Sequence, residues 1–368
     1  MGESNYYIGL MSGTSIDSID AALIEISDNK TQLIANHSED IPRALKNALL
    51  NLCSPGADEI TRMGTADHQL GKLFAKATNT LLTKSQLTAK DIYAIGSHGQ
   101  TIRHLPESST PFTLQIGDPS IISHDTGICT VADFRRSDMA AGGQGAPLAP
   151  AFHQAAFSHP KKHRVIVNIG GMANITSLNA LKPALGFDTG PGNCLLDYWA
   201  QQHINQSFDT NGDWGASGKM IPALLEKCLA DPYFQRRPPK STGREHFNPA
   251  WLSMLLNDEK YLPVDVQTTL TALTARSISN DIKALEDSVD EVFICGGGAH
   301  NSALIDSIGS ELASIPVNST EPLGIAADWV EAAAFAWLAH QTLNNRPANL
   351  PSVTGANKAC VLGAIYPV

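Results

Sequence analysis

Residues 7–26 read Tyr-Ile-Gly-Leu-Met-Ser-Gly-Thr-Ser-Ile-Asp-Ser-Ile-Asp-Ala-Ala-Leu-Ile-Glu-Ile. An apolar run at 6–11, typical of a β-strand, leads into a turn of small and hydroxyl-bearing residues at 12–15. Asp17 and Asp20 follow, before a second strand-like run. Such a turn offers N–H and hydroxyl donors to phosphate oxygens, and nearby carboxylates can hold the accompanying Mg²⁺. The alternative is an ordinary β-hairpin with a polar tip.

The chain repeats this arrangement in its second half. A strand-like run at 164–168 leads into the turn Ile169-Gly170-Gly171-Met172, and another strand-like run follows at 173–178. Glycine has no Cβ, so the backbone of such a turn can approach a phosphate closely. Two turns of this kind facing across a cleft would bind a polyphosphate from both sides. Two unrelated hairpin turns are the simpler alternative.

Strand-like and helical segments follow both turns in the same order, which predicts duplicated α/β lobes. Two such lobes would form a central cleft, with ligands at the carboxyl ends of the strands. We expect the N-terminal lobe at 1–133 plus 350–368 and the C-terminal lobe at 134–349. The short apolar run at 359–366 would return to the first lobe.

Composition excludes several classes of protein. Of the 368 residues, 43% are hydrophobic, and the formal net charge is -10. A chain of this length calls for more than one core. The acidic balance argues against nucleic-acid or anionic-membrane partners, and no apolar run reaches transmembrane length. Six scattered cysteines without metal-type spacing, and a start without a secretory signal, predict a cytoplasmic protein with reduced thiols.

Asp188 is the candidate catalytic residue. It ends an apolar strand-like run and precedes a Gly/Pro turn and a helix expected at 194–203, with Asn193 as its N-cap. At this position the carboxylate would face the cleft, and the helix dipole would help to keep it ionised, as suits a general base. The alternative is an aspartate that caps the helix.

A three-glycine turn at 296–298 lies between a strand-like run and a helix. A dinucleotide fingerprint would need glycine where Asn301 stands, so we interpret this turn as a floor under a planar adenine. A merely tight turn is the alternative. The sequence has no Walker-A motif, which disfavours a P-loop fold.

One residue and one charged cluster are further candidates for a functional role. Glu331 lies in a helix-like run at 324–338 that is apolar almost all round, where an unpaired carboxylate is costly. A charged cluster that could bind an acidic group comprises Asp133, Arg135, Arg136 and Asp138. The alternatives are a structural pair with an arginine for Glu331 and solvated charges for the cluster. The basic, proline-rich loop at 236–244 is expected to be an exposed connection.

Several segments resemble motifs of the anhydro-N-acetylmuramic acid kinase family. The likeness follows the order of the chain over essentially its whole length. One departure is Ser18, where the family usually has glycine in Gly-Thr-Ser-x-Asp-Gly-x-Asp. The matching segments are 9–17, 142–148, 168–174, 187–193, 241–244, 295–301 and Glu331 with the Ala/Phe/Trp run after it.

The resemblance implies the duplicated ribonuclease-H-like lobes of the actin, sugar-kinase and heat-shock ATPase superfamily. It also implies a cytoplasmic step of peptidoglycan recycling, in which ATP, water and 1,6-anhydro-N-acetylmuramic acid become ADP and N-acetylmuramic acid 6-phosphate. Phosphoryl transfer of this kind needs charge neutralisation, for which Mg²⁺ is expected. A homodimer is expected from the family alone.

The resemblance also assigns roles to residues. Asp188 would deprotonate a water that attacks the anomeric carbon, because O6 of the anhydro sugar is an ether oxygen without a proton. Arg135 and Glu331 carry over as substrate contacts, and no metal ligand is assigned. The expected ATP site comprises Gly13, Thr14, Ser15, Ile16, Asp17, Ser18, Ile19, Asp20, Asn168, Gly170, Gly171 and Gly297.

Two other classes of function are open on the residues alone. An ATP-dependent interaction protein would use the same clamp as a switch, but the chain has no length left for a peptide-binding domain. A dinucleotide oxidoreductase is disfavoured by the broken glycine pattern at 296–301.

Overall fold

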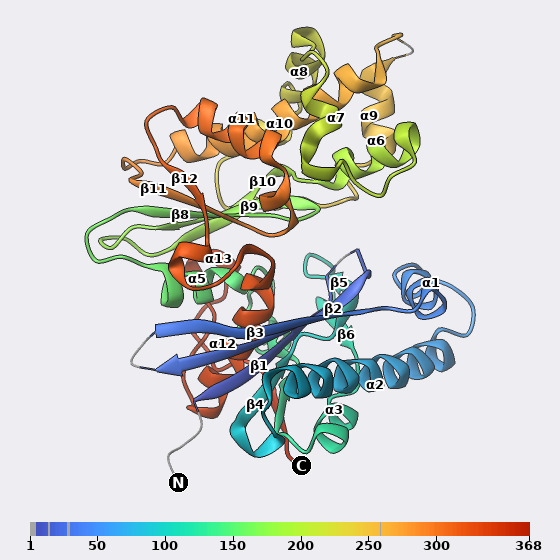
Figure 1. Cartoon of the computed structure of the whole chain (residues 1–368), viewed down its shortest axis with the longest axis vertical. Coiled ribbons are helices and arrows are strands. Elements are labelled where there is room, and N and C mark those ends of the chain that lie inside the picture. Colours follow the sequence, from blue (N-terminus) through green and yellow to red (C-terminus); the bar gives the residue numbers. More distant parts are fainter. Residues whose placement is uncertain (1–4, 14, 28–29, 258) are drawn as a thin grey trace. The chain divides into compact units, whose positions relative to one another are not determined.

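The computed structural model describes residues 5–13, 15–27, 30–257 and 259–368. The chain divides into two compact units (Figure 1): unit 1 comprises Met1–Ala156 and Leu323–Val368, and unit 2 comprises Phe157–Pro322. In sequence, unit 2 is therefore an insertion into unit 1. The expected boundaries after 133 and 349 differ from these, because helix α12 (Val330–Leu343) packs on β1, β2 and β4 of the first sheet.

Unit 1 is built on a six-stranded sheet of order β13-β7-β4-β1-β2-β3. Strands β1, β2 and β3 pair antiparallel, whereas β4 is parallel to β1 and β7 is parallel to β4. Strand β13 pairs antiparallel with β7, which confirms the predicted return of the last apolar run. The strands are β1 (Tyr6–Met11), β2 (Ser18–Ser27), β3 (Lys30–Asp40), β4 (Ile92–Ser97), β7 (Thr130–Ala132) and β13 (Ala364–Tyr366), with β5 (Gln100–Leu105) and β6 (Phe112–Ile116) in a separate ribbon.

Helices cover both faces of this sheet, because successive residues of β1 point to opposite sides. Ile8 and Leu10 are buried in one core with Phe74 of α2. On the opposite face Gly9 lies so close to α12 that a Cβ would come within 1.7 Å of the Ala332 carbonyl oxygen. The other helices of this part of the chain are α1 (Arg43–Leu52), α2 (Glu59–Ser85), α3 (Pro119–Thr126), α4 (Phe134–Ala140), α5 (Ala149–Phe157) and α13 (Pro351–Thr354).

Unit 2 is built on a five-stranded sheet of order β10-β9-β8-β11-β12. Helices α10 and α11 share a core with its strands, in which Val167 and Ile294 pack with Ile278 and Ile308. The strands are β8 (Arg164–Ile169), β9 (Met172–Leu178), β10 (Leu185–Pro191), β11 (Glu291–Cys295) and β12 (Val317–Ser319). The helices are α6 (Cys194–Ile204), α7 (Asp213–Ala216), α8 (Pro222–Leu229), α9 (Pro249–Leu256), α10 (Pro263–Lys283) and α11 (Ser302–Leu312).

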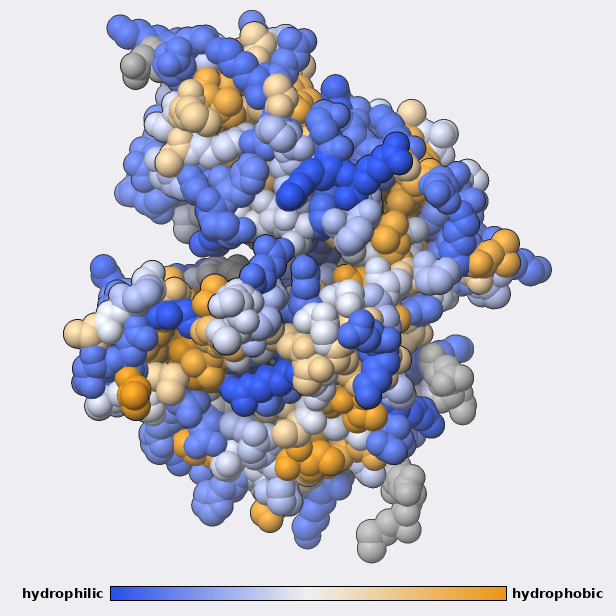
Figure 2. Space-filling model, turned by 180° about the vertical axis from the view of Figure 1, so that it is seen from behind, coloured by the Kyte–Doolittle hydropathy of each residue, from blue (hydrophilic) through white to orange (hydrophobic). Residues whose placement is uncertain are grey.

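The two sheets share one topology. In each, the first three strands pair antiparallel, and the next two strands continue parallel to the first. This confirms the predicted duplication of ribonuclease-H-like α/β lobes, while the central cleft stays a prediction. Within the described residues, no helix combines the length and the apolar character of a membrane span. Figure 2 shows one face of the molecule, where hydrophilic residues predominate and apolar residues form separate patches.

Candidate functional site

The turn between β1 and β2 holds the predicted phosphate-binding residues of unit 1. The Ile16 N–H donates to the Gly13 carbonyl (3.2 Å), and Ile16 has a positive φ of 54°. The buried Ser12 hydroxyl donates to Gln100 Oε1 (2.7 Å), which fixes the start of the turn. A Cβ added at Gly13 would meet nothing within 4 Å, so the backbone there is open to a ligand. Thr14 lies outside the described residues.

The side chains of the predicted phosphate site divide between core and surface. Ile16 and Ile19 are buried in the hydrophobic core, so only their backbone groups are available to a nucleotide. Ser15 is exposed, and the exposed Asp17 pairs with Lys46. We predicted that every residue from 13 to 20 contacts ATP. For Ile16 and Ile19 this prediction is now limited to their backbone groups, because their side chains anchor the turn in the core.

Asp20 is the half-buried carboxylate of this turn. Its Oδ1 accepts hydrogen bonds from Ser38 Oγ (2.8 Å) and Ser18 Oγ (3.2 Å). Ser18, which stands where the family usually has glycine, therefore contacts Asp20 through its hydroxyl. Burial is the main cause that raises the pKa of Asp20, and the negative charge of Asp328 adds to it. A nearby cation would stabilise the ionised form of such a partly desolvated carboxylate.

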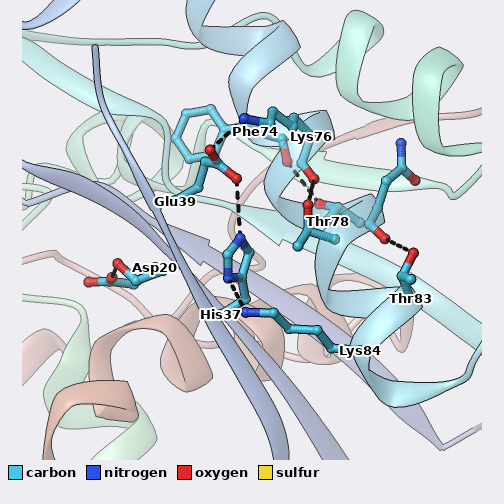
Figure 3. Close-up of polar contacts among 11 residues, drawn as sticks. Asp20, His37, Glu39, Phe74, Lys76, Thr78, Thr83 and Lys84 are labelled. Carbon is cyan, nitrogen blue, oxygen red and sulfur yellow. Dashed lines mark hydrogen bonds and ion pairs between the residues drawn. The ribbon is translucent and has the colours of Figure 1, made fainter. Parts of the chain in front are cut away.

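Figure 3 shows polar side chains that link β3 to α2, with Asp20 of β2 standing apart from this group. Glu39 accepts from Lys76 Nζ (2.7 Å) and lies 3.2 Å from His37 Nε2, while Lys84 Nζ donates to His37 Nδ1 (2.9 Å). The Lys76 ammonium holds the pKa of Glu39 below its usual range. This group fixes the outer strand of the sheet on the helix beneath it.

The predicted nucleotide residues of unit 2 lie at the carboxyl ends of the adjacent parallel strands β8 and β11. The carbonyl of Gly170 accepts from Asn193 N–H (2.8 Å), and Gly171 accepts from Gly192 N–H (2.9 Å), so the start of α6 fixes this turn. Asn193 Nδ2 donates to the Ile169 carbonyl (3.2 Å). Asn193 is therefore at the N-cap position, as predicted, but its side chain makes no cap hydrogen bond.

The three-glycine turn joins the same group. A Cβ at Gly296, whose φ is +78°, would come within 2.4 Å of Asn168 Oδ1. Gly297 is exposed, and a Cβ there would meet nothing closer than Asn193 Nδ2 at 3.9 Å. The structure thus brings together four residues that the sequence predicted separately: Asn168, Gly170, Gly171 and Gly297.

Asp188 lies in β10, next to a register shift in its pairing with β9. Its Oδ2 accepts from the Thr242 N–H (3.0 Å), and its backbone carbonyl accepts from the Tyr233 hydroxyl (2.7 Å). Burial raises the pKa of Asp188 to about 6, an effect that Glu245 strengthens and that Thr242 and Lys240 oppose.

The structure corrects two expectations about Asp188. It does not cap a helix, because α6 begins at Cys194 and its N-cap is Asn193. We expected the helix dipole to keep the carboxylate ionised, but desolvation dominates and favours the protonated form. A carboxylate with a pKa near neutrality is well matched to general-base chemistry.

Arg135 and Glu331 lie near each other in unit 1. Arg135 Nη1 donates to the Gly145 carbonyl (2.8 Å), and its Nε and Nη2 lie 3.2 and 2.9 Å from His98 Nε2. Because both of these guanidinium nitrogens donate, that ring nitrogen accepts and the imidazole is neutral. Burial lowers the pKa of Arg135 to about 10, against the opposing charges of Glu331 and Asp138.

The rest of the charged cluster after β7 has other roles. Asp138 is fully buried and accepts from Asn349 Nδ2, Thr354 Oγ1 and the Gly145 N–H at 2.7–2.8 Å. Asp133 pairs with Arg136 across 3.4 Å. Asp138, Asp133 and Arg136 therefore have protein partners, and the role of Arg135 as a substrate contact stays a prediction.

Sequence reasoning gave no role to the residues that hold Arg135 and Asp188 in place. His98 follows β4 directly, in a polar cluster that marks a strand end. Thr242 lies in the Ser-Thr-Gly-Arg run, which contributed to the family resemblance without an assigned contact. The loop at 236–244 was expected to be an exposed connection, but Lys240 within it is buried.

Comparison with known proteins identifies the family. A model of the family described as anhydro-N-acetylmuramic acid kinase matches residues 5–368. The chain is 52% identical over 362 residues to the anhydro-N-acetylmuramic acid kinase of Coxiella burnetii (strain Dugway 5J108-111), covering 98% of this chain and 97% of the relative. It is 53% identical over 363 residues to the enzyme of that name from Shewanella sp. (strain ANA-3), covering 98% of each chain.

Among solved structures, component A of the (R)-2-hydroxyglutaryl-CoA dehydratase of Acidaminococcus fermentans aligns with 90% of this chain and 96% of its own. The sequence identity is 13% and the TM-score is 0.49. The match of the family model over nearly every residue, together with relatives above 50% identity, decides the assignment. The chain belongs to the anhydro-N-acetylmuramic acid kinase family.

Proposed function

We propose that this chain is an ATP-dependent kinase that hydrolytically opens 1,6-anhydro-N-acetylmuramic acid and phosphorylates O6. The products are ADP and N-acetylmuramic acid 6-phosphate, in peptidoglycan recycling. The observation that carries the proposal is full-length membership of the family, joined to a buried carboxylate, Asp188, whose pKa of about 6 suits a base. Neither the switch protein nor the oxidoreductase considered above gains support from these relatives.

Asp188 acts in the proposed mechanism as the base for water. It takes a proton from a water molecule, whose oxygen attacks the anomeric carbon of the anhydro sugar. The C1–O6 bond breaks, and O6 takes the γ-phosphoryl group of ATP while ADP leaves. Asp188 then releases its proton to solvent. The Thr242 N–H, 3.0 Å from Oδ2, orients the carboxylate during these steps.

ATP binding is assigned to both glycine-bearing turns. The open backbone at Gly13 supports phosphate binding by the turn at 13–20, including the undescribed Thr14. The exposed Gly297 beside Asn193 supports contact with the planar base, and Gly170 and Gly171 belong to the same cluster. Close approach of a nucleotide to each turn is what the absent Cβ atoms allow.

Mg²⁺ is expected with the nucleotide, and the residues present fit it. Within the described part of the chain, no three acidic, histidine or cysteine side chains form a metal site by themselves. Mg²⁺ that travels with ATP needs only one or two carboxylates besides phosphate oxygens and waters. Asp20, half-buried and with a raised pKa, would hold it. When bound, the ion neutralises charge on the transferring phosphoryl group.

Arg135 and Glu331 are assigned to the sugar. Arg135 offers a guanidinium that His98 and the Gly145 carbonyl fix in place, and Glu331 opposes its charge. A cation held in this way suits the carboxylate of the lactyl group. We further propose a cytoplasmic location and a homodimer, the latter to be tested by light scattering in solution.

The function is tested by incubating the protein with Mg²⁺, ATP and the anhydro sugar in ¹⁸O-labelled water. We expect a phosphorylated sugar with the label at its anomeric hydroxyl and none in the phosphoryl group. Product without label at that carbon would overturn the hydrolytic mechanism. Absence of any sugar-dependent ADP release would overturn the function itself.

A further inference from the structure

A buried ion pair links the loop that contacts Asp188 to helix α10. The side chain of Lys240 is only 1% exposed, and its Nζ lies 3.0 and 2.9 Å from Oδ1 and Oδ2 of Asp281 on α10. The ammonium also lies 5.5 Å from the ring centroid of Phe187 and 5.2 Å from that of Tyr233. This lysine therefore packs among the residues that flank Asp188.

The segment that carries Lys240 also holds Asp188. The Asp188 N–H donates to the Lys240 carbonyl (3.2 Å), and two residues later the Thr242 N–H donates to Asp188 Oδ2. The Tyr233 ring beneath the ammonium belongs to the residue whose hydroxyl binds the Asp188 carbonyl. Asp188 thus depends for its orientation on a loop that the Lys240–Asp281 pair ties to α10.

Stability alone is a weak reason for such a pair. Burying two charges costs desolvation energy, and replacing a buried pair with apolar residues is often neutral or stabilising. The loop has no helix or strand between Arg236 and Phe247, so hydrogen bonds and this pair set its position. Accurate placement of a catalytic group is a role that apolar packing would not replace.

The charged groups that face Asp188 come from several elements. On the loop, Lys240 favours its ionised form and Glu245 opposes it. On α10, Asp281 compensates Lys240. The remaining groups are Tyr233, which Asp188 itself influences, and Arg236, which acts on Tyr233. Lys240 is thus a cation whose charge acts on Asp188.

We propose that Lys240, fixed by Asp281, is a positioning residue that holds the Thr242 amide against Asp188 and keeps the base ionised near neutral pH. The proposal rests on the proposed function for Asp188. Lys240 touches no reacting atom and acts through the loop and its charge.

The test compares Lys240→Met with the wild type. Removing the ammonium destabilises the ionised carboxylate and frees the loop, so the acidic limb of kcat/KM should move to higher pH. We expect kcat at pH 7 to fall by about tenfold or more, with KM for ATP within about twofold, because small displacements of a catalytic group are costly. Lys227→Met, which removes an exposed lysine paired with Glu259 in the same unit, should leave both values unchanged.

A second variant separates positioning from folding. Lys240→Met with Asp281→Asn removes both charges, so it should fold better than the single variant while the displaced pH limb persists. Return of the wild-type pH profile in the double variant would overturn the proposal, since it would show a merely structural role. An unchanged profile in Lys240→Met would overturn it as well.

Direct titration of Asp188 distinguishes this inference from the proposed function. Carbon-13 NMR of labelled aspartate carboxyls, assigned with Asp188→Asn, reports the ionisation of Asp188 without turnover. A higher pKa in Lys240→Met, with no sugar phosphorylation by the wild type, would reject the function and keep the electrostatic link. An unshifted pKa in a folded Lys240→Met would reject the link even in an active kinase.

Discussion

At the scale of single residues, the proposed base Asp188 predicts how the reaction depends on pH. Burial raises the pKa of this base to about 6, and only the ionised form can accept a proton from water. We therefore expect kcat/KM to level off above pH 7 and to fall about tenfold per pH unit well below 6. Initial rates between pH 4.5 and 8.5 measure this, and a limb near pH 4 would contradict the buried base.

Asp188→Asn removes the base while keeping its shape. We expect turnover to fall by about 10²–10⁴-fold, the usual contribution of a general base, with nucleotide affinity retained. Turnover is measured by ADP release and affinity by calorimetric titration with a non-hydrolysable ATP analogue. Near-normal turnover would remove Asp188 as the base.

The same substitution should not weaken the fold at neutral pH. A carboxyl whose folded pKa lies above its unfolded value binds more protons when folded, so its contribution to stability declines as pH rises from about 4 to 6. The neutral asparagine carries no such penalty. At pH 8 we expect Asp188→Asn to unfold at a urea concentration equal to or above that of the wild type.

Asp138 illustrates a residue whose role is structural. Its buried carboxylate accepts from Asn349, Thr354 and the Gly145 N–H, which joins α4 to the chain near the C-terminal end. In Asp138→Asn, an NH₂ group replaces one of the two accepting oxygens and faces N–H and O–H donors. The substitution should therefore lower the free energy of unfolding by about 3 kcal/mol. Asp133→Asn, at a more exposed pair with Arg136, should stay within about 0.5 kcal/mol in the same urea titration.

At this scale the sequence indicated that Asp188 lies near the end of a strand and that the glycines lie in turns after strands, and their roles stay predictions. The sequence could not show which residues of the turn offer only backbone groups to a nucleotide. The structure shows this for Ile16 and Ile19, whose side chains lie in the core. The sequence also could not show Lys240 as buried, since a basic residue among prolines is normally solvated and its partner Asp281 is far away in sequence.

At the scale of elements, helix α12 and strands β1 and β4 come into backbone contact at two glycines. A Cβ at Gly9 would lie 1.7 Å from the Ala332 oxygen, and one at Gly96 would lie 1.9 Å from the Phe335 oxygen. The apolar run at 6–11 predicted strand β1 to the residue. The sequence pattern did not show that α12 packs on this sheet, because a helix that is apolar all round has no single face that indicates its packing partner.

Gly9→Ala tests this contact. The added methyl group would force α12 away from the sheet, and we expect a loss of about 3 kcal/mol or more, at the upper end of overpacking effects. Gly64→Ala on the exposed side of α2 meets nothing within 4 Å and should raise stability by about 0.5–1 kcal/mol. Equal midpoints for both variants in urea would contradict the close packing.

At the scale of the whole molecule, the repeated order of strands predicted the duplication, and the structure confirms it in both sheets. The predicted domain boundaries were placed by motif order, whereas the compact units follow packing, and helix α12 packs on the strands of unit 1. The order of motifs along the chain does not show which sheet a helix packs on.

Separate cores in the two units predict more than one unfolding transition. Ile8, Leu10 and Phe74 share a core within unit 1, and Val167, Ile278 and Ile308 share one within unit 2. Scanning calorimetry should give a calorimetric enthalpy above the van't Hoff value, the mark of departure from two-state behaviour. Gly9→Ala should lower the transition of unit 1 more than that of unit 2, and a single sharp two-state peak would contradict this.

The interrupted course of unit 1 bears on how the protein is made. Strand β1 is synthesised before unit 2, whereas the helix that packs on Gly9 is synthesised only after all of unit 2. Nascent domains generally fold as units once their residues are available. The inserted unit is therefore expected to reach its native state first, while the strands of unit 1 made before it stay partly uncovered and open to chaperones until helix α12 has been synthesised.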